Sequence, residues 1–427
     1  MLARRLTAAL ATGAITLLLA ACVPADAGSD PNNPRQLELF TSWTTPTERA
    51  GLDALLAVYA KRDPGIQIFD ASVAVGTGGT AQTALEARLK AGNPPDTFQA
   101  PAGAAITDLV DGGRLDDLSQ LVDRTGLADA LPLALRESVT SDAGLIHSVP
   151  IGVHRANLVW ANYDVLSAAG LDPAARAGSI DEWLGQLKLL RAAGVEYPLA
   201  LGTEWTQLLL FENVLLSDLG ADTYAGLWTG ATRWDGTFVK TAVDDYAALV
   251  GYVDPGFRSL DGDAAAGLVA DGSAAFVVLP DTALATFKVA GLDYGTDYAG
   301  LPTPGTRGVF DLLADSFTLP VGATHQDAAT TWLETVASPE GQLAFAVATG
   351  AIPARTDVDV TTLSTFQRTA ASSLTSDQLV PSVTFGAAAR PAWVNALTKA
   401  ITRYSDDRKA GALVAALRET AQFVPER

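Results

Sequence analysis

Strand-like and helix-like segments alternate along most of this 427-residue chain, and that alternation restricts its fold more than any other feature. A short apolar strand pattern at residues 37–40 runs into a turn at 42–48. The helix pattern that follows places four large residues three or four positions apart, on one buried face (Leu52, Leu55, Leu56 and Tyr59). Such alternation predicts an α/β architecture with largely parallel sheets.

Helix and strand limits are visible further along the chain. Pro64 and Gly65 separate the first helix from a second strand at 66–69, and the next helix should end at Gly92, a C′ glycine. Ser179, with Glu182 three residues later, forms a capping box, and Ser338-Pro339 should open another helix. About 390 residues remain after the N-terminal region, which exceeds the usual size of one core and predicts two lobes.

The N-terminus has the pattern of a secretion signal. Arg4 and Arg5 precede an apolar stretch at 8–21 that is too short for a permanent membrane span. Residues 19–22 resemble a bacterial lipobox, and Cys22 is the chain's single cysteine. We therefore expect a signal peptide at 1–21, lipidation of Cys22 and a flexible tether over 22–36, with a plain signal peptide as the alternative. This predicts an exported protein, lipid-anchored on the outer face of the cytoplasmic membrane or periplasmic.

Charge and cysteine content exclude several classes of function. Removal of residues 1–21 takes away two arginines and no acid, leaving 27 basic and 48 acidic residues, a net charge of −21. Such a charge repels phosphate backbones, so we expect no nucleic-acid partner, and membrane contact through the lipid anchor only. One cysteine allows neither an intramolecular disulfide nor a thiolate zinc site.

Motifs for catalysis or cofactor binding are scarce. The three histidines do not form H-E-x-x-H, and neither G-x-S-x-G nor a P-loop occurs. Residues 76–81 match G-x-G-x-x-A, with Asp96 near the spacing of a ribose contact, but a glycine turn between strand and helix is ordinary loop chemistry. We therefore expect no cofactor and no metal.

Aromatic and carboxylate side chains at turns are what remains. Trp43 and Glu48 follow the first strand, where ligands of open α/β sheets bind. A ring face stacks on a sugar and a carboxylate pairs with its hydroxyl groups, so these residue types suit a neutral polyol.

Eight segments, in order over nearly the whole mature chain, resemble the extracellular solute-binding proteins, family 1, of carbohydrate ABC transporters, and most closely their glucose/mannose-binding branch. They are Ser42-Trp43 with Glu48, GNPPDTFQ (92–99), VPIGVHRANLVWAN (149–162), LALGTEWTQLLLFENVLL (199–216), DGSAAFVVLPD (271–281), PGTRGVFDLLADSFTLPVGA (304–323), SPEGQLAF (338–345) and GAIPARTD (350–357).

The resemblance implies a two-lobed periplasmic-binding-protein fold of type II, with three hinge crossings that close on a sugar. Carried onto this chain, the N-lobe would comprise 37–153 and 281–318, and the C-lobe 154–280 and 319–427. The crossings would lie near His154, Val278 and Leu319, and His154-Arg155 with Asn157 match a hinge motif.

The same resemblance implies a set of ligand-binding residues. It puts Trp43, Glu48 and Gln99 on the N-lobe wall, Trp205 on the C-lobe wall and Asp281 at the second crossing. Asp315 and Arg355 are further candidates, and a buried ion pair is the competing role for both. The competing structural roles for the first five are a core tryptophan for Trp43, a helix-end carboxylate for Glu48, a loop amide for Gln99, a core cap for Trp205 and a turn aspartate for Asp281.

Four positions depart from the glucose-binding pattern. Pro101 and Phe385 stand where histidines are expected, and Gly262 and Gly300 stand where aromatic residues are expected. We therefore expect a roomier site for a sugar other than free glucose, with Phe385 stacking on a second sugar unit. The alternative is that neighbouring residues refill the space.

Together these features predict a monomeric, non-enzymatic receptor that delivers a mono- or oligosaccharide to the permease subunits of an ABC importer. The competing function from another class is an exported carbohydrate-active hydrolase, for which Glu48 and Asp281 would be the two carboxylates.

Overall fold

The computed structural model describes residues 30–44, 46–72 and 80–424. The first strand, β1 (Gln36–Phe40), the first helix, α1 (Pro46–Arg62), and the second strand, β2 (Gln67–Asp70), lie where the sequence pattern predicts them. The signal segment and Cys22 lie outside the described residues, as does most of the 76–81 glycine motif.

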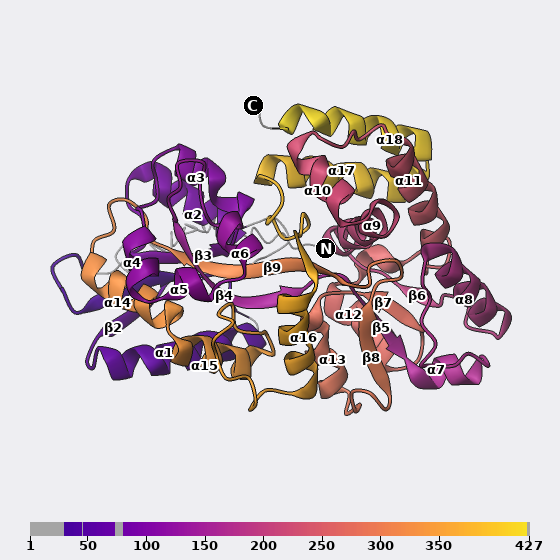
Figure 1. Cartoon of the computed structure of the whole chain (residues 1–427), viewed down its shortest axis with the longest axis horizontal. Helices are drawn as coiled ribbons and strands as arrows, with labels where there is room; N and C mark the ends of the chain where they lie inside the picture. Colours follow the sequence, from indigo (N-terminus) through magenta and orange to yellow (C-terminus); the bar gives the residue numbers. More distant parts are fainter. Residues whose placement is uncertain (1–29, 45, 73–79, 425–427) are drawn as a thin grey trace, which may run out of the picture.

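Two separate β-sheets organise the chain (Figure 1). The first has the order β10-β9-β3-β1-β2, with β4 also paired to β9, and the second has the order β6-β7-β5-β8. Their remaining strands are β3 (Thr97–Pro101), β4 (Ser148–Arg155), β9 (Val309–Thr318) and β10 (Gln378–Pro381) in the first sheet, and β5 (Leu158–Asn162), β6 (Leu199–Ala200), β7 (Phe276–Val278) and β8 (Tyr298–Pro302) in the second.

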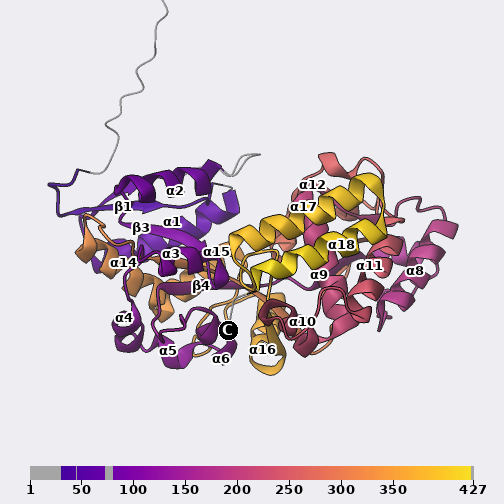
Figure 2. The same cartoon turned by 90° about the horizontal axis from the view of Figure 1, so that it is seen from above.

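Helices surround each sheet and make it a lobe. In the first lobe α1 packs on α14 (Gln326–Ala337) and α15 (Pro339–Thr349), and in the second lobe α9 (Glu204–Leu219) packs on α11 (Thr237–Val250) and α17 (Pro391–Asp407). Figure 2 shows α17 and α18 extending from the middle of the molecule across the second lobe. The remaining helices are α2 (Thr80–Ala91), α3 (Thr107–Asp111), α4 (Ser119–Arg124), α5 (Leu127–Ala130), α6 (Leu133–Ser138), α7 (Tyr163–Ala168), α8 (Ile180–Ala192), α10 (Ala221–Thr229), α12 (Gly262–Ala270), α13 (Leu284–Val289), α16 (Thr365–Ser376) and α18 (Ala410–Glu419), with 3₁₀ turns at Ala104–Ile106, Phe257–Ser259, Asp281–Ala283 and Thr420–Phe423.

The helix ends predicted at Gly92, Ser179 and Ser338 are present in the structure. Gly92 follows α2 with a φ of +71°, a backbone conformation that glycine adopts without strain. Ser179 and Ser338 accept hydrogen bonds from the backbone N–H groups of Glu182 and Gly341. The Glu182 carboxylate, however, accepts from the N–H of Gly178 and not from that of Ser179. The N-caps are therefore confirmed, and the capping box is shifted by one residue.

The expectation of largely parallel sheets is wrong. Among the described strands, four pairings are parallel and four are antiparallel. Strand β9 runs antiparallel to both β3 and β4, and β5 runs antiparallel to both β7 and β8. The reason is that β5 and β9 each enter their sheet from the other lobe, so they arrive from the opposite direction.

The lobe boundaries also differ from those expected. Strand β8 pairs with β5, so residues 298–302 belong to the second lobe, while α14 and α15 pack on α1 and β4 and belong to the first. The chain thus crosses between the sheets at 156–157, 303–308 and 382–390 within its described part. Only the crossing beside His154 lies where it was expected, and those placed near Val278 and Leu319 are wrong.

Residues 30–35, expected within the flexible tether, contact the first lobe. The Nε2 atom of His325 lies 3.0 Å from the carbonyl oxygen of Asp30, and the Asn33 side chain donates to Gln67 over 3.0 Å. Arg35 forms an ion pair with Asp63. In the described part of the chain, no helix combines the length and apolar composition needed to cross a bilayer.

Candidate functional site

A polar chain of side chains lies where β3 and β9 pair. The Oγ of Ser42, just after β1, donates to the Oε1 of Gln99 over 3.2 Å. The Nε2 of Gln99 donates in turn to the Oδ1 of Asp315 over 2.7 Å. These two side chains meet because β3 and β9 are antiparallel, with Pro101 opposite Asp315 and Gln99 two residues away on the same face. The paired strands β3 and β9, in the interior of the first sheet, therefore present an amide and a carboxylate together.

Asp315 has an altered acidity. Burial raises its pKa to about 6, although the charge of His154 and the hydrogen bond from Gln99 lower it. The negative charge of Glu48, in the first turn of α1, raises it further. A carboxyl group with this pKa exchanges its proton near neutral pH, so both its charge and its hydrogen-bonding role depend on pH in that range.

His154 and Asp281 form a buried pair beside this carboxylate. The Nδ1 of His154 lies 2.6 Å from the Oδ1 of Asp281, and the backbone N–H of Arg155 donates to Oδ2 over 3.3 Å. Burial by itself lowers the pKa of His154, but the charges of Asp281 and Asp315 outweigh it and raise that pKa above the ordinary value. The imidazolium charge therefore persists toward neutral pH, next to Asp315.

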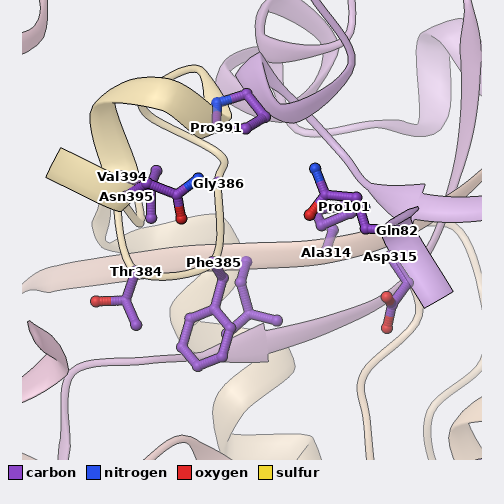
Figure 3. Close-up of a pocket in the computed structure, with 11 residues that line it drawn as sticks. Gln82, Pro101, Ala314, Asp315, Thr384, Phe385, Gly386, Pro391, Val394 and Asn395 are labelled. Atoms are coloured by element: carbon purple, nitrogen blue, oxygen red, sulfur yellow. The ribbon is translucent and has the colours of Figure 1, made fainter. Parts of the chain in front are cut away.

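A cavity of about 330 Å³ opens at Asp315. Its walls come from both lobes. Figure 3 shows Pro101, Gln82 and Asp315 on one side, and Thr384, Val394 and Asn395 on the other. The volume lies within the range of small-molecule pockets.

Aromatic rings gather at the second-lobe side of this cavity. Phe385 lines the cavity, and its ring centroid lies 5.9 Å from that of Trp205, at an interplanar angle of 59°. Trp205, at the start of α9, is 36 % exposed, whereas the other seven tryptophans are at most 7 % exposed. Among the indoles of the described residues, Trp205 is thus the one that offers a large part of its surface to solvent.

The predicted site residues separate into two groups. Gln99, Asp315 and Phe385 lie at the cavity or on the side chains that line it, Glu48 acts on Asp315 through its charge, and Trp205 contacts Phe385. Trp43, by contrast, is 4 % exposed and packs against Phe317 and Phe345, so it offers little ring surface to a ligand.

Two charged candidates are engaged elsewhere. Asp281 is buried and occupied by His154 and Arg155. Arg355 is buried in the first lobe, where it forms an ion pair with Asp357 and donates to the carbonyl oxygens of Thr125 and Ala337. The structure does not bring Arg355 to the cavity.

The expectation of empty space at two glycines is wrong. A Cβ atom added at Gly262 would lie 2.5 Å from the Cζ2 of Trp205, and one added at Gly300 would lie 2.8 Å from the ring of Trp160. Both positions are small because a tryptophan from another segment fills the volume beside them. Pro101 and Phe385, the other two departures, do line the cavity.

Sequence reasoning missed several lining residues. Gln82 lies on α2, Thr384 in the third crossing, and Asn395 on α17. None of them stands in a motif, and their common position arises only when α2 and α17 approach the end of β3. In the sequence these residues could have been suspected only from their residue types, because amide and hydroxyl groups suit a hydroxylated ligand.

Comparison with known proteins places the chain in a family. The family model described as "Bacterial extracellular solute-binding protein" matches residues 43–343. A probable sugar-binding periplasmic protein of Mesorhizobium japonicum is 32 % identical over 76 % of this chain and 77 % of its own length. An uncharacterized ABC transporter extracellular-binding protein of Pyrococcus horikoshii is 29 % identical over 92 % and 90 %.

Solved structures share the fold. The bacterial solute receptor AcbH superimposes with a TM-score of 0.79 at 16 % identity, covering 91 % of this chain and 97 % of AcbH. The two-lobed arrangement, the family match and the relatives agree, and the chain belongs to the bacterial extracellular solute-binding proteins.

Proposed function

We propose that this protein is the extracytoplasmic receptor of an ABC importer and that it captures a saccharide between its two lobes for delivery to the permease. One observation carries the proposal. A carboxylate bonded to an amide, Asp315 with Gln99, lies at the same inter-lobe cavity as the ring of Phe385. Polar groups of this kind pair with hydroxyl groups, and an aromatic ring covers the apolar face of a sugar.

The names of the relatives support the same function. One relative is named as sugar-binding, another is named as part of an ABC transporter, and AcbH is described as preferring β-D-galactopyranose. A neutral ligand also suits this cavity because Asp315 is the one charged side chain among the described residues that line it.

Capture should involve closure of the lobes. The cavity takes Pro101 and Asp315 from the first lobe, Phe385 from the third crossing and Asn395 from α17, so a ligand that touches both walls binds the closed arrangement better. The first two crossings are tied together by Asn157, which accepts from the N–H of Asp311 and donates to Thr306 and Val309. Bending at these crossings would therefore be concerted.

The ligand that this site fits best is larger than one glucose unit. Pro101 and Phe385 take the positions of two family histidines, which removes two polar contacts, and Phe385 with Trp205 adds ring surface for a second sugar unit. Each lost hydrogen bond weakens binding by about 0.5–1.5 kcal/mol. Because Trp205 and Trp160 occupy the space beside Gly262 and Gly300, the added room is confined to the cavity at Phe385.

Lipid anchoring through Cys22, on the outer face of the cytoplasmic membrane, and a monomeric state complete the proposal. The support for the anchor is the lipobox-like sequence at 19–22, which includes the chain's single cysteine. A hydrolase is the competing function, with Glu48 and Asp281 as its two carboxylates, but Asp281 is already occupied by His154 and Arg155. We favour binding without turnover because the family and its relatives are binding proteins.

Calorimetry over a panel of mono- and oligosaccharides tests the function. A bound sugar at 100 times its dissociation constant should stabilise the protein by about 2.7 kcal/mol, and small-angle scattering should show compaction. Incubation with labelled oligosaccharide should return it uncleaved. Binding without compaction would contradict capture by closure, and cleavage would establish the hydrolase.

A further inference from the structure

Glu212, on the buried helix α9, holds the segment that carries Phe385. Its side chain is fully buried, and four donors surround it. The N–H of Val383 donates over 2.6 Å, and the N–H of Thr384 and the Oγ of Ser382 each donate over 3.1 Å. The hydroxyl of Tyr224 donates over 2.6 Å. Hydrogen bonds to Glu212 therefore attach the third crossing, between β10 and α17, to α9 immediately before Phe385.

These four donors favour an ionised carboxylate at Glu212, since a protonated oxygen would face a donor with its own hydrogen. Burial raises the pKa of Glu212 above its ordinary value, although the four donated hydrogen bonds act in the opposite direction. The nearby Asp311, on β9, has no hydrogen-bond partner for either carboxylate oxygen in the described structure. Burial and the charge of Glu212 raise the pKa of Asp311 well above its ordinary value. The charge of Arg155 acts in the opposite direction on Asp311, but the hydrogen-bond geometry favours the charge on Glu212, where the four donors are.

One helix therefore places both aromatic rings of the site. Trp205 stands in the first turn of α9, and Glu212 stands seven residues later, two turns along the same helix. Trp205 lies on Gly262, and Phe385 is held one residue beyond Thr384 by Glu212. The rings of Trp205 and Phe385, 5.9 Å apart, are thus both connected to α9, one directly and the other through the hydrogen bonds of Glu212 to residues 382–384.

We propose that Glu212 is a positioning residue which, by fixing the 382–384 backbone, sets the preference of the site for saccharides of more than one ring. The proposal rests on the proposed function and adds to it a residue that does not touch the ligand. Loss of the hydrogen bonds to Glu212 would let Phe385 leave its position beside Trp205, so a second sugar unit would lose its contact with the ring. A first unit, held at Asp315 and Gln99, would keep its contacts.

The test compares Glu212→Gln with the wild type. Glutamine keeps the size of the side chain, but its NH₂ group cannot accept from a backbone N–H. Hydrogen exchange at the Val383 and Thr384 amides should become faster in this variant. The ratio of disaccharide to monosaccharide affinity, measured by calorimetry with maltose, cellobiose and diacetylchitobiose against glucose, galactose and N-acetylglucosamine, should fall about five- to tenfold, the factor of one lost ring contact.

Two controls separate positioning from loss of stability. Ser405→Ala removes a buried hydrogen bond to Gln207, on the same helix α9 but away from the crossings, so it should lower stability and leave the affinity ratio unchanged. Phe385→Ala should lower the ratio, and adding Glu212→Gln to it should lower the ratio no further. If Glu212→Gln does not fold, Glu212→Asp, which keeps the charge but is one methylene shorter, takes its place.

An equal loss of affinity for both classes of sugar, or additive effects in the double variant, would overturn the proposal. If the wild type binds none of these sugars, the proposed function fails. The hydrogen-exchange experiment would still test whether Glu212 holds residues 382–384 in place. Unchanged exchange at Val383 and Thr384 in Glu212→Gln would then show that Glu212 does not hold the segment.

Discussion

Replacing Asp315 by asparagine should change how the stability of the protein depends on pH. Burial raises the pKa of Asp315 from 3.8 to about 6. The folded state therefore holds this proton more tightly than the unfolded state does, and the stabilisation is fully present below pH 4 and lost as pH rises through 6. At 1.36 kcal/mol per pH unit the loss is about 3 kcal/mol, an upper value because the side chain is only partly buried.

Asparagine keeps the acceptor for Gln99 and carries no charge, so the stability of Asp315→Asn relative to the wild type should rise by about 2–3 kcal/mol between pH 4 and pH 7. Urea unfolding at pH 4, 5, 6 and 7 measures this difference. Asp357→Asn is the matched control, because the hydrogen bond from Arg355 lowers the pKa of Asp357 and its pH trend should have the opposite sign. Parallel stability curves for the wild type and Asp315→Asn would refute the reasoning.

The remaining predictions concern binding, the anchor and the ring contacts. A hydroxyl group that donates to an ionised carboxylate contributes about 1.5–3 kcal/mol, so Asp315→Asn should weaken saccharide binding about 10- to 150-fold at pH 7.5 and little at pH 5, and a pH-independent ratio in calorimetry would show that the ligand does not contact Asp315. Cys22→Ser should leave ligand binding intact but release the protein from membranes or retain it as precursor, and unchanged lipid labelling would argue against the anchor. Gly262→Ala places a Cβ atom 2.5 Å from Trp205, so the indole must move, and calorimetry should show a larger loss of affinity for disaccharides than for monosaccharides. Arg355→Met removes a buried network and should cost about 3 kcal/mol or more in urea unfolding, with the dissociation constant changed less than about twofold. A large loss of saccharide affinity in a folded Arg355→Met protein would show that Arg355 contributes to the binding site after all.

Features that depend on neighbouring residues could be predicted from the sequence. The cap at Ser338, the αL glycine at Gly92 and the face of α1 each follow from a few adjacent residues, and all are present in the structure. The direction of β9 and the packing of α14 and α15 could not be predicted in this way, because they depend on which lobe the chain has just left. The parallel sheets and two crossings were wrong for that reason.

The candidate site shows the same limit, because contacts between residues far apart in the sequence could not be predicted. Gln99 and Asp315 were found through the resemblance, but their hydrogen bond joins residues 216 positions apart. Trp43 is buried because Phe317 and Phe345 cover it, and neither is near it in the sequence. The filling of the space beside Gly262 by Trp205, from another element, likewise has no local signal.

The unequal exposure of the tryptophans makes the protein an optical sensor of its own ligand. Seven indoles are buried and should emit at short wavelength, with intensities that a ligand at the cavity leaves nearly constant. Trp205 alone among the described indoles is exposed enough for acrylamide to reach it, and it lies against Phe385 at the cavity wall. A sugar that covers this ring should therefore shift the red edge of the emission spectrum and slow its quenching, so occupancy can be followed without a label.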